Sequence, residues 1–315
     1  MVMSSKEPIS LTYNPQLSSR EYGVNLYIDE GNNDPQRVQF NAIVQYCGEF
    51  ESNYSIFHLF KQDLVLNRNL ADEHAIQLAV ECNKAFYPLT LLTDKRGLIY
   101  TLRTDNILAR WKEQRVKIER YFKGEEARKY IEATESALMN KEKVNMIVLG
   151  DLFFSQFFEL NYRSDTINFK RLIHLAPFAD PQEFDCQQSV DKESLKDKDS
   201  DVFVILQLGS MSKEYTPGEL FPRRLFDPQA NEKIVEGRYE VTYELQKETN
   251  VIDSMTGYFI LHQGGHKLFE IKLEAYHLSE KTIQPEKDTE LLKLVKNKNK
   301  QNKSLIGRAL AYLLD

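Results

Sequence analysis

The chain has 315 residues, of which 42% are hydrophobic, so it can form one large domain or two modest ones that each bury a core. Its 47 acidic and 41 basic residues give a formal net charge of -6, which argues against a dedicated nucleic-acid binder but leaves room for a local basic patch. Its 3 cysteines are far apart, with neither the spacing of a metal site nor the density of a disulfide scaffold, and this favours a reducing compartment.

The sequence offers no export or membrane signal at its N-terminus. The first residues hold no apolar stretch of the roughly 7–15 residues that a signal peptide needs, and no later segment approaches the roughly 18 apolar residues of a membrane span. We therefore expect a soluble, cytoplasmic protein without a membrane span. Residues 1–20 have no hydrophobic periodicity and are expected to form a flexible N-terminal arm.

The fold is expected to begin near Tyr22 with β-strands. Residues 38–46 alternate apolar and polar side chains, which is the period of a half-buried strand, and residues 54–66 form a second candidate. A short helix is expected over residues 70–86. It is followed by a hairpin over residues 89–102, in which an aspartate and a glycine supply the tight turn.

Helical periodicity dominates after this hairpin. An apolar stripe that includes Ile107, Trp111 and Ile118 predicts a helix over residues 104–122, and a second helical stretch is expected over residues 125–158. The apolar end of that stretch is too short to span a bilayer, so we expect a buried helix packed on the sheet. Four phenylalanines at this end are expected in the core: Phe153, Phe154, Phe157 and Phe158.

The second half of the chain has mainly β patterns. Strands are predicted over residues 165–176 and 201–208, separated by a solvated, highly charged loop at 191–201. Residues 213–231 contain three prolines and are expected to form a long connection. The strongest β pattern of the sequence predicts a meander of three antiparallel strands: residues 239–245, 255–261 and 269–275.

The end of the chain combines a polar stretch and an apolar one. Residues 279–303 are rich in lysine and are expected to form a linker, and residues 304–315 predict an amphipathic helix. Such a helix can dock on a partner or fold back on its own sheet, because its apolar face indicates only that something covers it. The residues expected to contact a partner are Leu305, Ile306, Ala309, Leu310 and Leu313.

These elements predict an α+β fold. Antiparallel β-sheet is expected in both halves, over residues 21–160 and 161–278, with a helical segment at about residues 104–160 between them. One composite domain and two subdomains are both compatible with this pattern.

Two histidines near a glycine turn form the first candidate site. A three-residue turn over residues 263–265 would pair His262 with His266 on one face of the hairpin, at a separation that suits one metal ion. A two-residue turn at Gly264 and Gly265 would place the two imidazoles on opposite faces. No third ligand lies nearby in the sequence, so an ordinary hairpin tip is favoured over a metal site.

Asp151, inside an apolar stretch, is a candidate general base, because burial raises the pKa of a carboxyl group. The simpler interpretation is that it lies at a rim or pairs with a lysine or arginine. Nothing selects Cys47, Cys82 or Cys186 as a nucleophile, and Cys82 is expected to be a small buried side chain. Motifs for phosphate, dinucleotide, zinc, calcium or serine-nucleophile chemistry are absent, so no cofactor is expected.

The leading functional hypothesis is a non-enzymatic protein-binding module, such as an adaptor, a chaperone or an assembly subunit, that uses a sheet face or the C-terminal helix. One alternative is a hydrolase with a site near the 213–231 loop and a contribution from His262 or Asp151. A second alternative is a weak binder of nucleic acid or acidic surfaces through the lysine-rich linker. No aromatic residue interleaves those lysines, so base stacking is not expected there.

Overall fold

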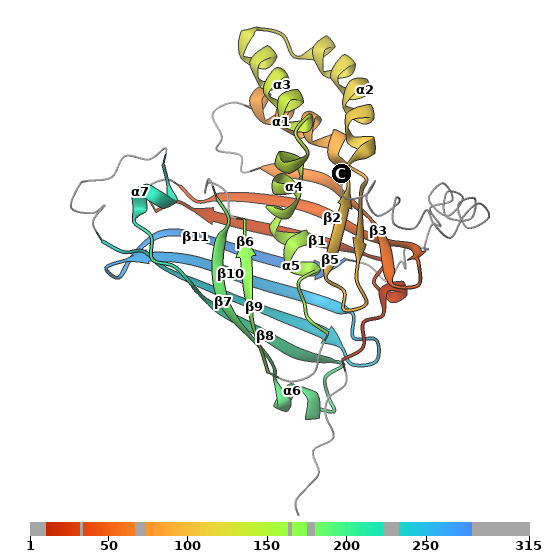
Figure 1. The fold of residues 1–315 in the computed structure, drawn as a ribbon, viewed down its shortest axis with the longest axis vertical. Coiled ribbons are helices and arrows are strands. Elements are labelled where there is room, and N and C mark those ends of the chain that lie inside the picture. The colour runs from red at the N-terminus through yellow and green to blue at the C-terminus, as the bar shows by residue number, and fades with distance from the viewer. Residues whose placement is uncertain are drawn as a thin grey trace, which may run out of the picture.

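The computed structural model describes residues 11–31, 34–66, 73–162, 166–174, 180–222 and 233–278. Its main feature is an antiparallel sheet of 11 strands in the order β5-β4-β3-β2-β1-β11-β10-β9-β8-β7-β6 (Figure 1). The strands are β1 (Arg20–Asp29), β2 (Gln36–Phe50), β3 (Tyr54–Leu66), β4 (Leu89–Thr93), β5 (Ile99–Arg103), β6 (Ile167–Ile173), β7 (Gln182–Val190), β8 (Val202–Met211), β9 (Glu236–Gln246), β10 (Ile252–Gln263) and β11 (His266–His277).

The helices of the described residues are mostly short. They are α1 (Glu73–Asn83), α2 (Asp105–Tyr121), α3 (Glu125–Leu138), α4 (Lys141–Leu149), α5 (Leu152–Phe157), α6 (Lys192–Lys196) and α7 (Pro217–Leu220), with 3-10 turns η1 (Pro15–Leu17) and η2 (Lys84–Phe86). None of these helices is long and apolar enough to cross a membrane.

The two halves of the chain build one sheet. Strands β1 to β5 come from the first half and β6 to β11 from the second, and β1 pairs with β11 through contacts such as Val24 with Ala275 and Leu26 with Leu273. The expected combination of antiparallel sheet and helices is therefore confirmed. The expected arrangement of sheet in two halves is not, because the strands form a continuous ladder across the junction.

One face of the sheet is apolar and buried, and the other is more polar and faces solvent. In β9, Tyr239, Val241, Tyr243 and Leu245 are buried, whereas the residues between them point to the opposite, more polar face. This alternation gives each strand one face that must be covered. The predicted meander is confirmed as β9, β10 and β11, joined by short connections.

The predicted hairpin over residues 89–102 is confirmed as β4 and β5. Asp94 N–H donates to Leu98 O at 2.9 Å, and Gly97 N–H donates to Asp94 O at 3.0 Å. Gly97 has a φ of 87°, a value that favours glycine.

Helices α1, α2 and α3 group on one side of the sheet, and α4 leads from this helical lobe down to α5, which contacts β11 (Figure 1). The predicted stripe of Ile107, Trp111 and Ile118 is buried on α2. The four phenylalanines expected in the core are also buried.

The stretch expected as one helix over residues 125–158 is three helices, which is a correction. Asn140 and Asp151 interrupt it, because each adopts an extended backbone and caps the helix that follows. Asn140 Oδ1 accepts from Lys143 N–H at 3.1 Å, and Asp151 Oδ1 accepts from Phe154 N–H at 3.3 Å. The segment 144–160, expected as one buried helix, is therefore divided at Asp151, and Met146 and Ile147 in its first part are exposed.

Several segments differ from or extend the expectation. Strand β7 was not predicted, and the charged loop at 191–201 contains the short helix α6. Within the proline-bearing connection, Thr216 and Glu219 form a capping box that starts α7. Leu11 is buried against the core, although it lies in the segment expected to be a flexible arm.

Candidate functional site

An apolar cleft lies between the inner face of the sheet and the helices α4 and α5. Its volume is about 280 Å³. Strands β1, β3, β4 and β11 supply one wall, and η2, α4 and α5 supply the other. The apolar residues that line it are Leu26, Ile28, Phe86, Tyr87, Leu89, Ile147, Val148, Leu152, Phe154 and Ile271.

A buried ion pair supplies the two charges of this cleft. Lys61 Nζ contacts Asp151 Oδ2, and their side chains are only 13% and 10% exposed. The ammonium also lies over the Phe40 ring, 4.0 Å from its centroid. Lys61 extends from β3 and Asp151 caps α5, so the pair joins the sheet to the buried helix. Its charges cancel within the cleft.

Tyr87 lines the same cleft and is neutral. Burial raises the pKa of its hydroxyl well above the ordinary value, and the charge of Asp151 and a hydrogen bond to it act in the same direction. The cleft therefore combines an apolar wall with one ammonium, one carboxylate, one phenol and the amide of Asn83. Small-molecule sites share this combination of an apolar lining with a few polar groups, and the volume of this cleft lies near the lower end of their range.

Aromatic packing holds α5 against the sheet. Phe153 and Phe157 lie 5.6 Å and 5.4 Å from the ring centre of Tyr22 on β1. The Tyr22 hydroxyl donates to Ile252 O at 2.7 Å, which satisfies the polar end of this buried ring. Helix α5 is thus part of the core and forms a fixed wall of the cleft.

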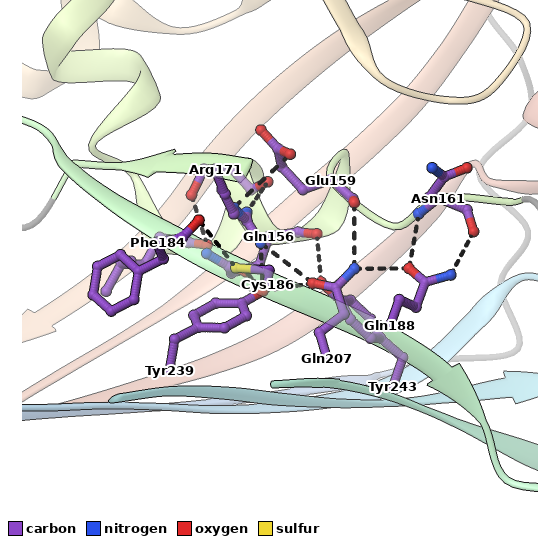
Figure 2. Close-up of polar contacts among 12 residues, drawn as sticks. Gln156, Glu159, Asn161, Arg171, Phe184, Cys186, Gln188, Gln207, Tyr239 and Tyr243 are labelled. Carbon is purple, nitrogen blue, oxygen red and sulfur yellow. Dashed lines mark hydrogen bonds and ion pairs between the residues drawn. The ribbon is translucent and has the colours of Figure 1, made fainter. Parts of the chain in front are cut away.

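A second polar cluster fixes the other end of α5 (Figure 2). Arg171 on β6 points inward, and its side chain is only 3% exposed. It donates to Ser155 O at 3.2 Å, to Gln207 Oε1 at 3.3 Å and to the hydroxyl of Tyr239. The guanidinium therefore ties the edge strand to α5 and to the neighbouring strands.

The charge of Arg171 is balanced by several partners. Glu159 Oε2 lies 3.8 Å from its Nε. Burial disfavours the charged form of the guanidinium, but the Tyr239 hydroxyl oxygen and the Glu159 carboxylate outweigh this effect and raise the pKa of Arg171 above its ordinary value. With its donors largely engaged by protein acceptors, this arginine has a structural role rather than the open geometry of an anion site.

Glutamines continue this cluster along the inner face. Gln207 Nε2 donates to Gln188 Oε1 at 2.9 Å, and Gln188 Nε2 donates to Asn161 O at 2.7 Å (Figure 2). The Tyr239 hydroxyl lies 2.5 Å from Gln207 Oε1 and 3.1 Å from Gln156 Oε1 and can donate to one of them at a time. The bonds between Gln188 and Asn161 satisfy the backbone N–H and C=O of Asn161 in the segment that follows α5.

The two histidines of the β10–β11 hairpin are not placed to bind the same metal ion. Gln263 pairs with His266 and His262 pairs with Lys267, so the turn consists of Gly264 and Gly265 alone. For this two-residue turn we expected the imidazoles on opposite faces. Within the described residues, no group of three or more histidine, cysteine or acidic side chains is arranged to hold a metal.

The structure separates the catalytic candidates. Asp151 pairs with Lys61 at the cleft, as its simpler interpretation predicted, and His262 is not among the residues that line the cleft. Cys47, Cys82 and Cys186 are buried. Burial raises the pKa of both Cys82 and Cys186 to about 11, so these two are neutral thiols near pH 7.

Sequence reasoning did not find Lys61 or the cleft. Lys61 lies 90 positions before Asp151, and the mixed apolar and polar pattern of residues 54–66 does not show which face of the strand this lysine occupies. The predicted partner residues of the C-terminal helix, Leu305, Ile306, Ala309, Leu310 and Leu313, lie outside the described residues, as does the lysine-rich linker.

Comparisons with known proteins give little further information. No family model matches the chain, and no curated protein matches it. A solved structure described as lipid–protein interactions in lipovitellin is similar at 10% sequence identity and a TM-score of 0.44, over 82% of this chain and 25% of that chain. The chain thus spans about a quarter of that protein's length. A likeness of this degree does not establish a shared ligand or activity.

Proposed function

We propose that the protein is a non-enzymatic binding protein that holds a small, largely apolar molecule in the cleft between the inner sheet face and α4–α5. The observation that carries this proposal is the Lys61–Asp151 pair within an apolar wall. The ion pair presents polar atoms to an otherwise apolar cleft, and this combination suits a ligand with an apolar body and one polar end. The neutral buried thiols and the paired Asp151 favour binding over nucleophilic or acid–base chemistry.

The size of the cleft limits the ligand. At about 30 Å³ for each water-sized group, a volume of about 280 Å³ has room for roughly nine non-hydrogen atoms. Burying a chain of eight carbons contributes about 6 kcal/mol at about 0.8 kcal/mol for each methylene. The costs of association reduce this gain, so we expect dissociation constants between about 1 mM and 1 µM.

Methyl NMR tests where such a ligand binds. Protein labelled at the isoleucine δ1-methyl groups is titrated with 1-octanol, an uncharged molecule of suitable size. We expect the signals of Ile28, Ile147 and Ile271 to shift to saturation, because these residues line the cleft. Ile43, on the outer face of β2, and Ile131, in α3, should stay in place. Uniform shifts, or none up to the solubility limit of the alcohol, would exclude this site.

A protein-binding role as an adaptor, chaperone or assembly subunit is a second proposal. It is supported by exposed apolar side chains on the helical lobe, where Tyr121 is 79% and Met139 is 69% exposed. The proteins captured from lysate by the full chain would be compared with those captured by the Tyr121→Lys variant and by a chain that ends at Lys303. Loss of one partner with Tyr121→Lys would assign binding to the lobe, and loss on truncation alone would assign it to residues 304–315. A partner retained by both variants would oppose both assignments.

A further inference from the structure

We infer that the cleft selects an uncharged molecule with a hydroxyl end, such as a medium-chain alcohol, over the carboxylate or ammonium of the same chain length. This inference rests on the proposed function of the cleft. It follows from the opposite charges and the remaining hydrogen-bonding capacity of Lys61 and Asp151.

Lys61 can donate to a ligand while its ion pair stays intact. An ammonium group has three N–H donors. Among the described residues, the hydrogen bond of Lys61 goes to Asp151, and the ring of Phe40 faces the same group. A ligand oxygen in the cleft can therefore accept from Lys61 without displacing the carboxylate.

Asp151 can also accept from the ligand. A carboxylate has about four lone-pair positions. Lys61 and the backbone N–H of Phe154 use two of them, and the hydrogen bond with Tyr87 uses a third. One position is left for a hydroxyl proton. An alcohol fits both partners at once, because its oxygen accepts from Lys61 while its proton is donated to Asp151.

A charged end group fits this pair poorly. The pair is neutral as a whole, so neither a carboxylate nor an ammonium gains a counter-charge for the hydration that it loses. A carboxylate that reaches Lys61 also comes close to the like charge of Asp151. An ammonium that reaches Asp151 has the same conflict with Lys61.

Asp151→Asn isolates this effect. Asparagine is as good an N-cap as aspartate, so the variant keeps the start of α5 while it removes the negative charge. Lys61 is then the remaining charge of the pair, and the cleft becomes positive. Asp63→Asn is the matched control, because Asp63 lies exposed on the same strand as Lys61 and its removal changes the net charge equally.

The experiment measures dissociation constants of 1-octanol, octanoate and octylammonium at pH 7.5 by titration calorimetry. Wild type and Asp63→Asn are expected to bind the alcohol at least tenfold more tightly than either ion. Asp151→Asn should gain at least tenfold in affinity for octanoate and prefer it to the alcohol.

Each other outcome has a definite meaning. If wild type binds octanoate as tightly as the alcohol, or if Asp151→Asn does not change the preference, the inference is wrong while the proposed function stands. If none of the three compounds binds wild type, the proposed function itself fails.

Discussion

Replacing Arg171 with methionine is expected to lower the free energy of unfolding by about 3 kcal/mol, because it removes a buried cation from a network whose acceptors stay behind. Arg171 bonds to Ser155 O, Gln207 and Tyr239, so its loss leaves polar atoms of α5 and β8 without their charged partner. Strand β6 also lies at an edge of the sheet and pairs only with β7 among the described strands. An inward-pointing charge on an edge strand also opposes edge-to-edge pairing with another chain.

Urea unfolding followed by circular dichroism measures this loss. Lys170→Met is the matched control, because Lys170 precedes Arg171 on the same strand but points outward, with a side chain 66% exposed. Its contact with Glu183 is a surface pair, so the control should unfold with wild-type parameters. Equal midpoints for the two variants would show that the inner network does not stabilise the fold.

The meander could be predicted because β9 and β11 alternate apolar and polar residues throughout residues 239–245 and 269–275, and because the connections to β10 are short. Strand β7 was missed for a physical reason, since its inward positions include Gln182 and Gln188. A buried glutamine looks like a solvent-facing residue in the sequence. The burial of Gln188 depends on hydrogen bonds with Gln207 and Asn161, which lie 19 and 27 positions away in the sequence. Such partners become neighbours only when the sheet has formed.

The break between α4 and α5 could have been predicted more closely. Gly150 followed by Asp151 is a helix stop followed by a helix start, because aspartate is among the best N-cap residues. The apolar residues on both sides hid this signal. The pairing of Asp151 was foreseen as a possibility, but its partner Lys61 was not, because salt-bridge partners on a strand and a distant helix share no local pattern.

The continuity of the sheet was also beyond the local patterns. Each half has its own antiparallel signals, and these do not reveal that β1 pairs with β11. This pairing places Ile28 on β1 directly opposite Ile271 on β11, and both residues line the cleft. The candidate site is therefore a product of the long-range register.

Affinity for an uncharged apolar probe in Ile28→Trp tests the central claim most directly, because the larger ring extends from β1 into the space that the ligand would occupy. Ile43→Trp is the matched control, since Ile43 is half-buried like Ile28 but lies on the outer face of the neighbouring strand. Binding of N-phenyl-1-naphthylamine is followed by its fluorescence, and circular dichroism confirms that both variants fold. We predict at least a tenfold loss of affinity for Ile28→Trp and wild-type affinity for Ile43→Trp. Equal, undiminished binding by both variants would contradict a ligand site in this cleft.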